Sequence, residues 1–281
     1  MSTPRRLDFA DHRRDLGTNR YVYAVVSRRA GGLSIGVNLN PDKVCNFDCP
    51  YCQVDRSAPG GDARIDVARL TGEMADILGR VAAGTLWSTP PFDTAAPEHQ
   101  RVVDIAFAGD GEPTTPPEFP AAAAAVSQIR DQVARGVPVR LLTNSTMLHR
   151  ARVRAALGHF DDVWCKLDAG TEAYFRVVDG TTFPYSRILR NLRELAAIRP
   201  ITIQAMFLTL HGAGPSDDEI GTWVERLREI GAAREGVGIT EVQVYTVARR
   251  PAQARVGALS GERLAWIAER AREAGFVARV V

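Results

Sequence analysis

The stretch KVCNFDCPYC at residues 43–52 decides how the rest of this chain is interpreted. It contains three of the chain's four cysteines in the spacing C-x3-C-x2-C, namely Cys45, Cys49 and Cys52. Thiolates at this density typically hold zinc or an iron–sulfur cluster. A structural zinc site needs a fourth protein ligand, and neither Cys165 nor His99 nor His149 has a second Cys or His at zinc-site spacing. A cubane cluster with three thiolates leaves one iron open to another molecule, so the spacing favours a [4Fe–4S] cluster.

This motif, with Tyr51 before its last cysteine, resembles the signature of the radical S-adenosylmethionine (SAM) superfamily. In that family the open iron chelates the amino and carboxylate groups of SAM, and one electron cleaves the sulfonium to give a 5′-deoxyadenosyl radical. Four shorter stretches resemble the branch related to the wyosine-type tRNA synthases: VSRR at 26–29, GVNLN at 36–40, KLDAG at 166–170 and VYTVAR at 244–249. The resemblance implies a [4Fe–4S] cluster and SAM as cofactors.

The composition indicates a globular protein with a sizeable core. The chain has 281 residues, of which 45% are hydrophobic, and this length suits one barrel-like domain. No apolar run approaches the length of a membrane span, and no hydrophobic signal region follows the first residues. We therefore expect a cytoplasmic protein, an address that suits an oxygen-sensitive cluster and reduced thiols.

The charge is nearly balanced, which argues against a dedicated nucleic-acid-binding protein. The chain has 35 basic and 33 acidic residues, and no DNA partner is expected. Residues 1–30 nevertheless hold seven Arg against three Asp, so residues 1–20 are predicted to be a basic, flexible arm that either meets phosphates or is simply solvated. Only Lys43 and Lys166 are lysines, and both lie inside candidate site motifs.

Strand-like and helix-like segments alternate along the rest of the chain, which predicts an α/β fold with a parallel sheet. After a lead-in strand at 21–26, the predicted strands are 33–40, 102–108, 139–143, 162–168, 201–210 and 241–247, with a helical segment after each. We interpret residues 21–281 as a single domain, a partial (β/α)6 barrel, which is also what the resemblance implies. The strand at 33–40 alternates apolar and polar residues, and its polar face suggests a ligand-holding lumen.

In such barrels the chemistry gathers where the strands end. The turn after the strand at 102–108 resembles the family's Gly-Gly-Glu motif, which meets the amino group of SAM, with aspartate in place of one glycine: Gly109, Asp110, Gly111 and Glu112. The residues after the next strand resemble the motif that touches the ribose and carboxylate of SAM: Thr143, Asn144 and Ser145. The alternative is a helix cap by Thr143 or Asn144, a role that is compatible with the first. By the same resemblance, Tyr51 is expected against the adenine.

Two further strands carry the candidate catalytic residues. Lys166 and Asp168 share one face of the strand at 162–168, either as an ion pair or as a proton donor and a ribose ligand. Cys165 falls on the opposite, apolar face and is expected to be structural. The remaining lumen is predicted to include Gln204, as a cofactor contact, and Gln243, Tyr245 and Arg249, of which the last two are candidate catalytic residues.

The sequence also departs from the wyosine-type synthases. Those enzymes carry a second cluster and a lysine that captures pyruvate, whereas residues 1–42 contain no Cys and no Lys. We expect no fused flavodoxin domain either, so electrons are expected from a separate donor such as flavodoxin or ferredoxin.

Three functions remain open from the sequence. The first is a radical SAM enzyme that abstracts hydrogen from an unidentified substrate, with tRNA or a nucleotide as the analogy-based choice and a peptide or small metabolite as the next. The second is an activase that installs a glycyl radical on a partner protein. The third is a non-catalytic module that binds zinc or a cluster.

Overall fold

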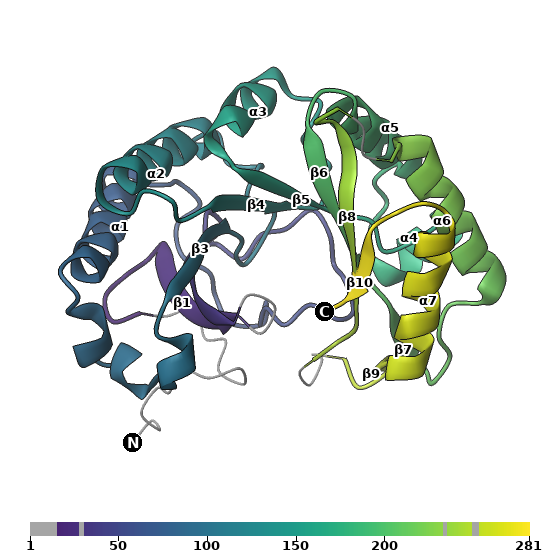
Figure 1. Ribbon diagram of the computed structural model, residues 1–281, viewed down its shortest axis with the longest axis horizontal. Coiled ribbons are helices and arrows are strands. Elements are labelled where there is room, and N and C mark those ends of the chain that lie inside the picture. The colour runs from purple at the N-terminus through teal and green to yellow at the C-terminus, as the bar shows by residue number, and fades with distance from the viewer. Residues whose placement is uncertain (1–15, 28–30, 233–234, 249–252) are drawn as a thin grey trace. The chain divides into compact units, whose positions relative to one another are not determined.

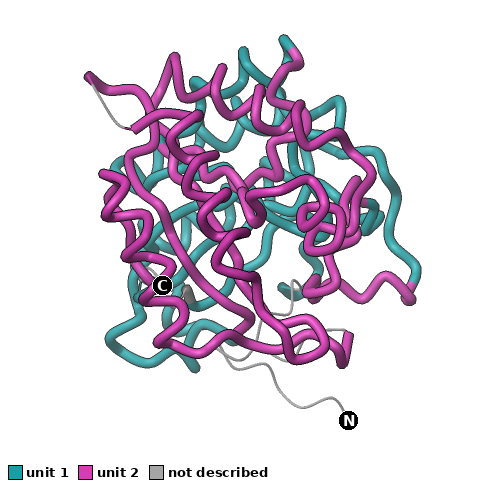
Figure 2. The backbone as a smooth tube through the Cα atoms, turned by 90° about the vertical axis from the view of Figure 1, so that its right-hand side faces the viewer, with its two compact units in different colours: residues 1–44, 59–141, 151–161 teal, residues 45–58, 142–150, 162–281 magenta. Residues whose placement is uncertain are grey.

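The computed structural model describes residues 16–27, 31–232, 235–248 and 253–281 (Figure 1). They fall into two compact units, residues 1–44, 59–141 and 151–161 in the first and residues 45–58, 142–150 and 162–281 in the second (Figure 2). The candidate catalytic residue Arg249 and residues 1–15 of the expected arm lie outside the described residues. The single domain at 21–281 stays a prediction.

The first unit contains the antiparallel pair and the first parallel strands. Its strands follow the order β1-β2-β3-β4, with β1 antiparallel to β2 and the others parallel. Their bounds are β1 Val22–Ser27, β2 Gly32–Val37, β3 Val102–Phe107 and β4 Val139–Thr143, the last two residues of which belong to the second unit. The α-helices are α1 Val67–Ala82, α2 Phe119–Val133 and α3 Ala151–Ala156, and α1 lies beside α2 (Figure 1). Short 3₁₀ turns lie at Leu86–Ser88, Phe92–Thr94, Pro97–His99 and Leu157–His159.

The second unit contains the parallel strands that follow. Their order is β5-β6-β8-β10, and each neighbouring pair is parallel. The bounds are β5 Asp162–Lys166, β6 Pro200–Met206, β8 Gly238–Tyr245 and β10 Ala278–Val280, while β7 Leu208–Leu210 pairs antiparallel with β9 Val256–Ala258. The helices are α4 Glu172–Val178, α5 Tyr185–Ala196, α6 Asp217–Ile230 and α7 Gly261–Glu273. In Figure 1, α7 packs beside β10.

The predicted alternation is confirmed, with local corrections. The six predicted strands correspond to β2, β3, β4, β5, β6 and β8. The strand predicted at 201–210 is divided at Phe207, whose ring is fully buried against Trp223 at a centroid distance of 5.1 Å. The backbone changes partner there, because Phe207 N donates to Tyr245 O while Leu208 pairs with Ala258. The sequence patterns missed α4 and β10, which are short.

The polar face of the strand predicted at 33–40 was expected to border a ligand. This expectation is wrong for two positions of that face, Ser34 and Gly36, which lie within β2. Ser34 donates a hydrogen bond to Asp104, which also forms an ion pair with Arg140 at 2.5 Å. The ring of Tyr23, on the antiparallel neighbour β1, covers Gly36. Protein side chains therefore fill these two positions of the face.

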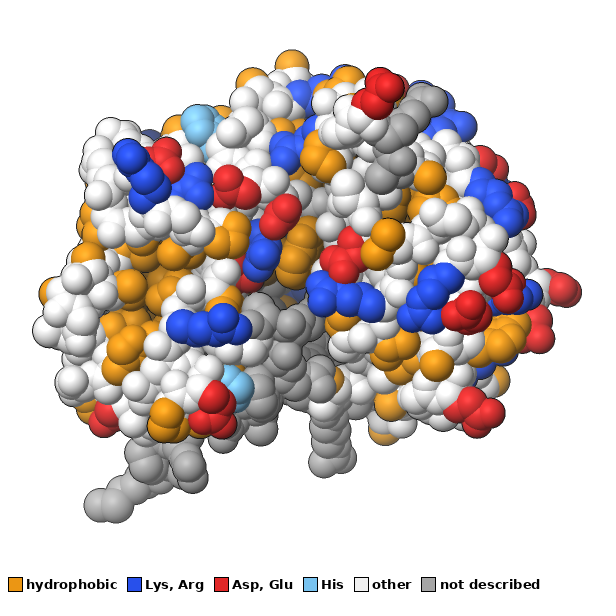
Figure 3. All heavy atoms as spheres, viewed as in Figure 1, with side chains coloured by type: hydrophobic (Ala, Val, Ile, Leu, Met, Phe, Trp, Pro, Cys, Tyr) orange, Lys and Arg blue, Asp and Glu red, His pale blue; other side chains and the backbone are white. Residues whose placement is uncertain are grey.

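The surface mixes both signs of charge. On the face shown in Figure 3, Lys and Arg side chains lie next to Asp and Glu side chains instead of gathering in one basic band. Within the described ranges, no helix combines the length and the apolar character needed to cross a bilayer.

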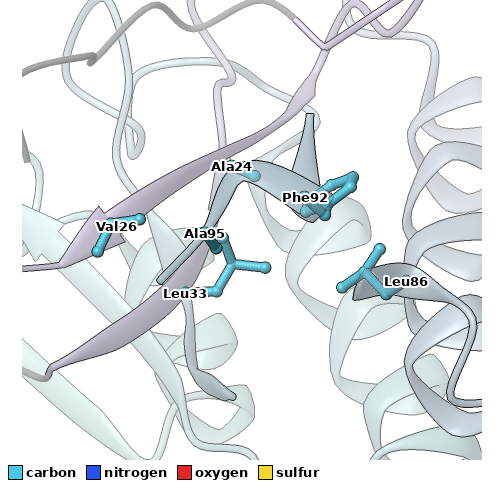
Figure 4. Close-up of a cluster of buried hydrophobic side chains, with 6 residues drawn as sticks. All are labelled: Ala24, Val26, Leu33, Leu86, Phe92 and Ala95. Atoms are coloured by element: carbon cyan, nitrogen blue, oxygen red, sulfur yellow. The ribbon is translucent and has the colours of Figure 1, made fainter. Parts of the chain in front are cut away.

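A small apolar cluster packs around β1 and β2 of the first unit. It joins the β1–β2 pair to the proline-rich segment that follows α1, and Figure 4 shows its six buried side chains: Ala24, Val26, Leu33, Leu86, Phe92 and Ala95. The segment at 85–100 is therefore held in place by burial of its apolar residues.

A carboxylate on α1 fixes the point where β1 begins. Glu73 accepts hydrogen bonds from the backbone N–H groups of Arg20, Tyr21 and Val22 at 2.8, 2.9 and 3.1 Å. Its side chain is 9% exposed. Replacing Glu73 with Ala is expected to lower the free energy of unfolding by about 3 kcal/mol, because buried N–H groups would lose a charged acceptor. Urea denaturation measures this loss.

The matched control is Asp76→Ala on the same helix. Asp76 is 56% exposed and pairs across the helix surface with Arg80. Such pairs contribute at most about 1 kcal/mol, so the control is expected to unfold close to the wild type. Equal losses for the two variants would show that Glu73 does not anchor β1.

Candidate cluster and cofactor site

The three motif cysteines lie on an extended loop of the second unit. Cys45, Cys49 and Cys52 are half-buried, and the backbone turns where Cys52 N donates to Cys49 O at 2.9 Å. No disulfide joins any of the four cysteines, all of which are described. Cys165 is fully buried within β5, on the apolar side where the strand pattern places it. The motif cysteines are thus accessible to a cofactor, whereas Cys165 is part of the core.

A closed ring of hydrogen bonds holds the first half of this loop. Asn144 Nδ2 donates to Asn46 Oδ1 at 2.6 Å, Asn46 Nδ2 donates to Thr146 Oγ1 at 2.7 Å, and Thr146 Oγ1 donates to Asn144 Oδ1 at 2.7 Å. Each side chain therefore both donates and accepts, which fixes the orientation of both amides. Asn144 was predicted to contact SAM; in the structure its amide holds the residue next to Cys45.

The segment after α4 supports the second half of the loop. Asp48 N donates to Gly180 O at 3.2 Å, and Thr181 Oγ1 donates to Asn46 O at 3.2 Å. Phe47 is buried and meets the Phe175 ring of α4 edge-on at 5.6 Å. The helix that the sequence patterns missed therefore helps to place the cysteine loop.

Lys166 lies next to the central cysteine. Its Nζ atom is 3.1 Å from Cys49 Sγ, 2.7 Å from Asp179 Oδ1 and 3.5 Å from Asp168 Oδ2. The expected pair with Asp168 is present, but the closer carboxylate is that of Asp179, which the sequence reasoning did not single out. The Asp-Gly dipeptide at 179–180 is a turn signal, and it was the one local indication that this segment is special.

Asp168 uses both of its oxygens within the protein. Tyr51 Oη donates to Oδ2, and Met206 N donates to Oδ1 at 2.9 Å. The carboxylate is 1% exposed. Its contacts hold the Tyr51 ring in place, so the structure gives Asp168 an orienting position beside the cysteine loop.

Burial controls the ionisation of this group of residues. It raises the pKa of the Cys49 thiol to about 12, although Lys166 lowers it, and it raises the pKa of Asp179 to about 6 against the same opposing charge. For Lys166 burial alone would lower the pKa, but Asp179, followed by Cys49 and Asp168, outweighs burial and raises it well above the usual value. Burial and then Asp168 also raise the pKa of Tyr51. Lys166 is therefore a cation, and Tyr51 keeps its proton.

The candidate residues on β6 and β8 form a separate polar row. Gln204 Nε2 donates to Gln243 Oε1 at 3.0 Å, and Gln243 Nε2 donates to Glu241 Oε2 at 2.8 Å. Tyr245 is half-buried at the end of β8 and pairs in register with Met206. Gln204 and Gln243 are buried, so this row offers little of its hydrogen-bonding capacity to a ligand.

In the first unit, the turn at 109–112 is held by Asn38. Asn38 Oδ1 accepts from Asp110 N at 3.1 Å, and Asn38 Nδ2 donates to Asp110 Oδ2 at 2.7 Å. A Cβ atom on Gly111 would stand 2.1 Å from Val44 O, so the close approach there requires glycine. Glu112 is 3% exposed and accepts from Thr114 N at 3.3 Å.

Two buried oxygens next to the predicted SAM motifs have no hydrogen-bond partner within the described residues. Thr115 Oγ1 donates to Glu112 O at 2.8 Å, so it can only accept from Asn40 Nδ2, and Asn40 Oδ1 is left without a donor. In the second unit the same is true of Ser145 Oγ, whose residue is fully buried. Buried polar atoms normally have partners. Each atom, within its own unit, is suited to a hydrogen bond with an ammonium or hydroxyl group of a ligand.

The three thiols fit a cluster better than a single ion. Over the described residues, no three His, Cys, Asp or Glu side chains are placed to hold one metal ion. In a cubane each thiolate binds a different iron, so the sulfur atoms need not converge on one point. The three cysteines lie half-buried on a loop that hydrogen bonds from Asn144 and to Gly180 hold in place, and this suits that arrangement.

Comparison with known proteins gives one family and a consistent fold. The family model described as "Radical SAM superfamily" matches residues 39–227. A protein named "GTPase Obg" from Brachyspira hyodysenteriae is 24% identical over 89% of this chain and 33% of its own length, and a UPF0026 protein from Helicobacter pylori is 27% identical over 76% and 64%. This chain thus spans between a third and two thirds of these curated relatives.

Solved structures support the same conclusion about the fold. A radical SAM methyltransferase from Sphaerobacter thermophilus has a TM-score of 0.62 at 14% identity, covering 92% of this chain and 68% of that one. TYW1 with a lysine–pyruvate adduct has a TM-score of 0.57 at 15% identity, covering 85% and 73%. These likenesses confirm the predicted partial barrel.

Proposed function

This chain belongs to the radical SAM superfamily, and we propose that it cleaves SAM reductively and uses the resulting radical to abstract hydrogen from a nucleotide substrate. The cofactors of the family are a [4Fe–4S] cluster and SAM. We assign the cluster to Cys45, Cys49 and Cys52. When bound, the cluster supplies the electron that breaks a carbon–sulfur bond of SAM to give methionine and a 5′-deoxyadenosyl radical.

The observation that carries this proposal is the arrangement around Cys49. Three residues proposed here to act at the site, Lys166, Asp168 and Tyr51, lie around it in one unit, with Lys166 Nζ 3.1 Å from the Cys49 sulfur. We propose that Tyr51, oriented by Asp168, borders the adenine of SAM. Tyr245, at the end of β8, is proposed to face the substrate, and Arg249 is proposed for the same role on the basis of the sequence alone.

The remaining cofactor contacts are assigned to the two unpartnered oxygens and the residues around them. Asn40 Oδ1 and the turn at 109–112 are proposed to accept hydrogen bonds from the SAM ammonium. Ser145 Oγ, with Thr143 and Asn144 beside it, is proposed to bind the ribose. Gln204 stays a proposed cofactor contact, although its amide already donates to Gln243.

A nucleotide, free or within tRNA, is the substrate class that we propose. The four stretches that resemble the wyosine-type synthases support it. On the face shown in Figure 3 the charges are mixed, without the continuous basic band that tracks a duplex. A lysine–pyruvate adduct is not proposed for Lys166, because its ammonium lies 2.7 Å from the Asp179 carboxylate and a carbonyl is attacked by a neutral amine.

The setting of the reaction follows from the same chemistry. We propose that the protein works in the reducing cytoplasm and receives electrons from a separate flavodoxin or ferredoxin. The cluster must be reduced before SAM can be cleaved, so the rate should depend on that donor.

The test is anaerobic reconstitution with iron and sulfide, followed by reduction with dithionite in the presence of SAM. The protein is expected to release 5′-deoxyadenosine and methionine slowly by itself, and several-fold faster with total tRNA or a nucleotide mixture. Deuterium on the substrate should appear in the 5′-deoxyadenosine. A cluster-loaded protein that leaves SAM intact would contradict the proposal. If only a peptide fraction accelerates SAM cleavage, the substrate is a peptide and not a nucleotide.

A further inference from the structure

The ammonium group of Lys166 contacts the sulfur of a proposed cluster ligand and two carboxylates at the same time. The Lys166 ammonium lies 2.7 Å from Asp179 Oδ1, 3.1 Å from Cys49 Sγ and 3.5 Å from Asp168 Oδ2, the last as an ion pair. The lysine side chain is 19% exposed, and Asp179 is 1% exposed. An ammonium carries three donors and no acceptor, so all three neighbours suit it.

Aromatic rings and a fixed carboxylate hold this ammonium in place. It lies 4.8 Å from the centre of the Tyr51 ring and 5.4 Å from that of Phe47. Both rings belong to the cysteine loop, so the lysine and the loop share one packed environment. Asp179, at the end of α4, also lies 3.7 Å from Cys49 Sγ through Oδ1. The carboxylate therefore anchors the lysine next to the sulfur.

We propose that Lys166 is a positioning residue that makes the cluster easier to reduce, by donating a charged hydrogen bond to the Cys49 thiolate. The inference rests on the proposed function, since it requires a cluster bound through Cys49. Reduction adds one negative charge, part of which resides on the thiolate sulfurs. A positive donor at 3.1 Å stabilises that charge, and the partly buried setting strengthens the effect.

A plain structural ion pair would not require this geometry. The pair with Asp179 is complete at 2.7 Å, yet the ammonium is also within hydrogen-bonding distance of the sulfur. The residue type supports the same conclusion. Only two of the 35 basic residues are lysines. A compact ammonium fits between a sulfur and two carboxylates, whereas the guanidinium of arginine is planar and has a different reach.

The experiment is a redox titration of the reconstituted protein, followed by the electron paramagnetic resonance signal of the reduced cluster. Lys166→Met removes the charge and keeps most of the stem. At a fixed potential we expect about a tenfold lower ratio of reduced to oxidised cluster, which corresponds to about 59 mV for one electron. Lys166→Arg keeps a positive charge without the compact ammonium, so its ratio of reduced to oxidised cluster is expected to lie between those of Lys166→Met and the wild type.

A second variant addresses folding. Lys166→Met alone leaves Asp179 without its counter-ion, which typically costs a few kcal/mol. The double variant Lys166→Met/Asp179→Leu removes both charges and avoids that penalty. Because Asp179 Oδ1 also lies 3.7 Å from Cys49 Sγ, the reference is Asp179→Leu alone, and the double variant should reduce at a more negative potential than that single variant because the donor to Cys49 is lost.

The outcomes separate this inference from the proposed function. A loaded double variant with the same potential as Asp179→Leu alone would overturn the role of Lys166 and leave it as half of a structural pair. Loss of SAM cleavage in Lys166→Met without a change in potential would overturn it as well, in favour of a direct contact with SAM or substrate. A wild type that binds no cluster would contradict both proposals, whereas a shifted potential in a protein that fails to cleave SAM would contradict the function alone.

Discussion

Alanine at Cys45, Cys49 or Cys52 is expected to reduce iron to a small fraction of the wild-type content and to abolish SAM cleavage. The reconstituted wild type should hold about four irons and four sulfides, the content of one cubane. Each of the three cysteines lies half-buried on the braced loop of the second unit, so each can supply one thiolate. Two thiolates leave half of the irons without a protein ligand. Iron and sulfide analysis with the visible absorption spectrum measures the loss.

Cys165→Ala is the matched control for these three variants. It makes the same chemical change at the one cysteine that is fully buried within a strand. We expect it to keep wild-type iron, sulfide and SAM cleavage, because the side chain faces the core. Circular dichroism confirms that each variant is folded before its metal is counted. Iron loss in Cys165→Ala together with one dispensable motif cysteine would show that the ligand assignment is wrong.

The sequence predicted the strands well because their signal is local. Alternating or continuous apolar runs, bounded by turn residues, identified β2, β3, β4, β5, β6 and β8. The errors lie where a distant contact decides the local structure. The break at Phe207 depends on its burial against Trp223, and no pattern within 201–210 reveals that neighbour. The seven residues of α4 are too few for a clear helical period.

The site shows the same division between local motif and distant contact. The cysteine spacing indicates cluster chemistry by itself, and strand parity placed Lys166 and Asp168 on one face. Asp179 lies 13 positions after Lys166 and reaches it only because α4 ends at the cysteine loop, as Lys166 Nζ–Asp179 Oδ1 at 2.7 Å shows. Asn46 was overlooked for a similar reason, since its two partners follow β4 about a hundred residues later. The motif predicts the ligands, whereas the residues that support the cysteine loop depend on contacts that form only when the chain folds.

Gly180→Ala is expected to cost the protein most of its cluster. Gly180 has a φ of +57°, a conformation that disfavours a side chain by about 1–2 kcal/mol. A Cβ atom there would also stand 2.0 Å from Asp48 O, which is backbone of the cysteine loop and cannot rotate away. Relief requires the loop to move, with loss of the hydrogen bond from Asp48 N to Gly180 O. Iron content after reconstitution is expected to fall several-fold.

The control is Gly221→Ala, in α6 of the same unit. A Cβ atom on Gly221 would meet nothing within 4 Å, and alanine in a helix is favoured over glycine by about 1 kcal/mol. This variant should keep its iron and unfold at slightly higher urea concentration. Any loss of iron in Gly180→Ala is then specific to the position and not a general effect of an added methyl group.

Gly180→Asn separates the two causes of the expected loss. Asparagine tolerates a positive φ better than alanine does, but it still carries a Cβ atom. If contact with Asp48 is the dominant cause, the asparagine variant should lose as much iron as the alanine variant; if backbone strain dominates, it should recover part of the cluster. Wild-type iron in both variants would contradict the prediction, since the cysteine loop would then hold its cluster without the close support of Gly180.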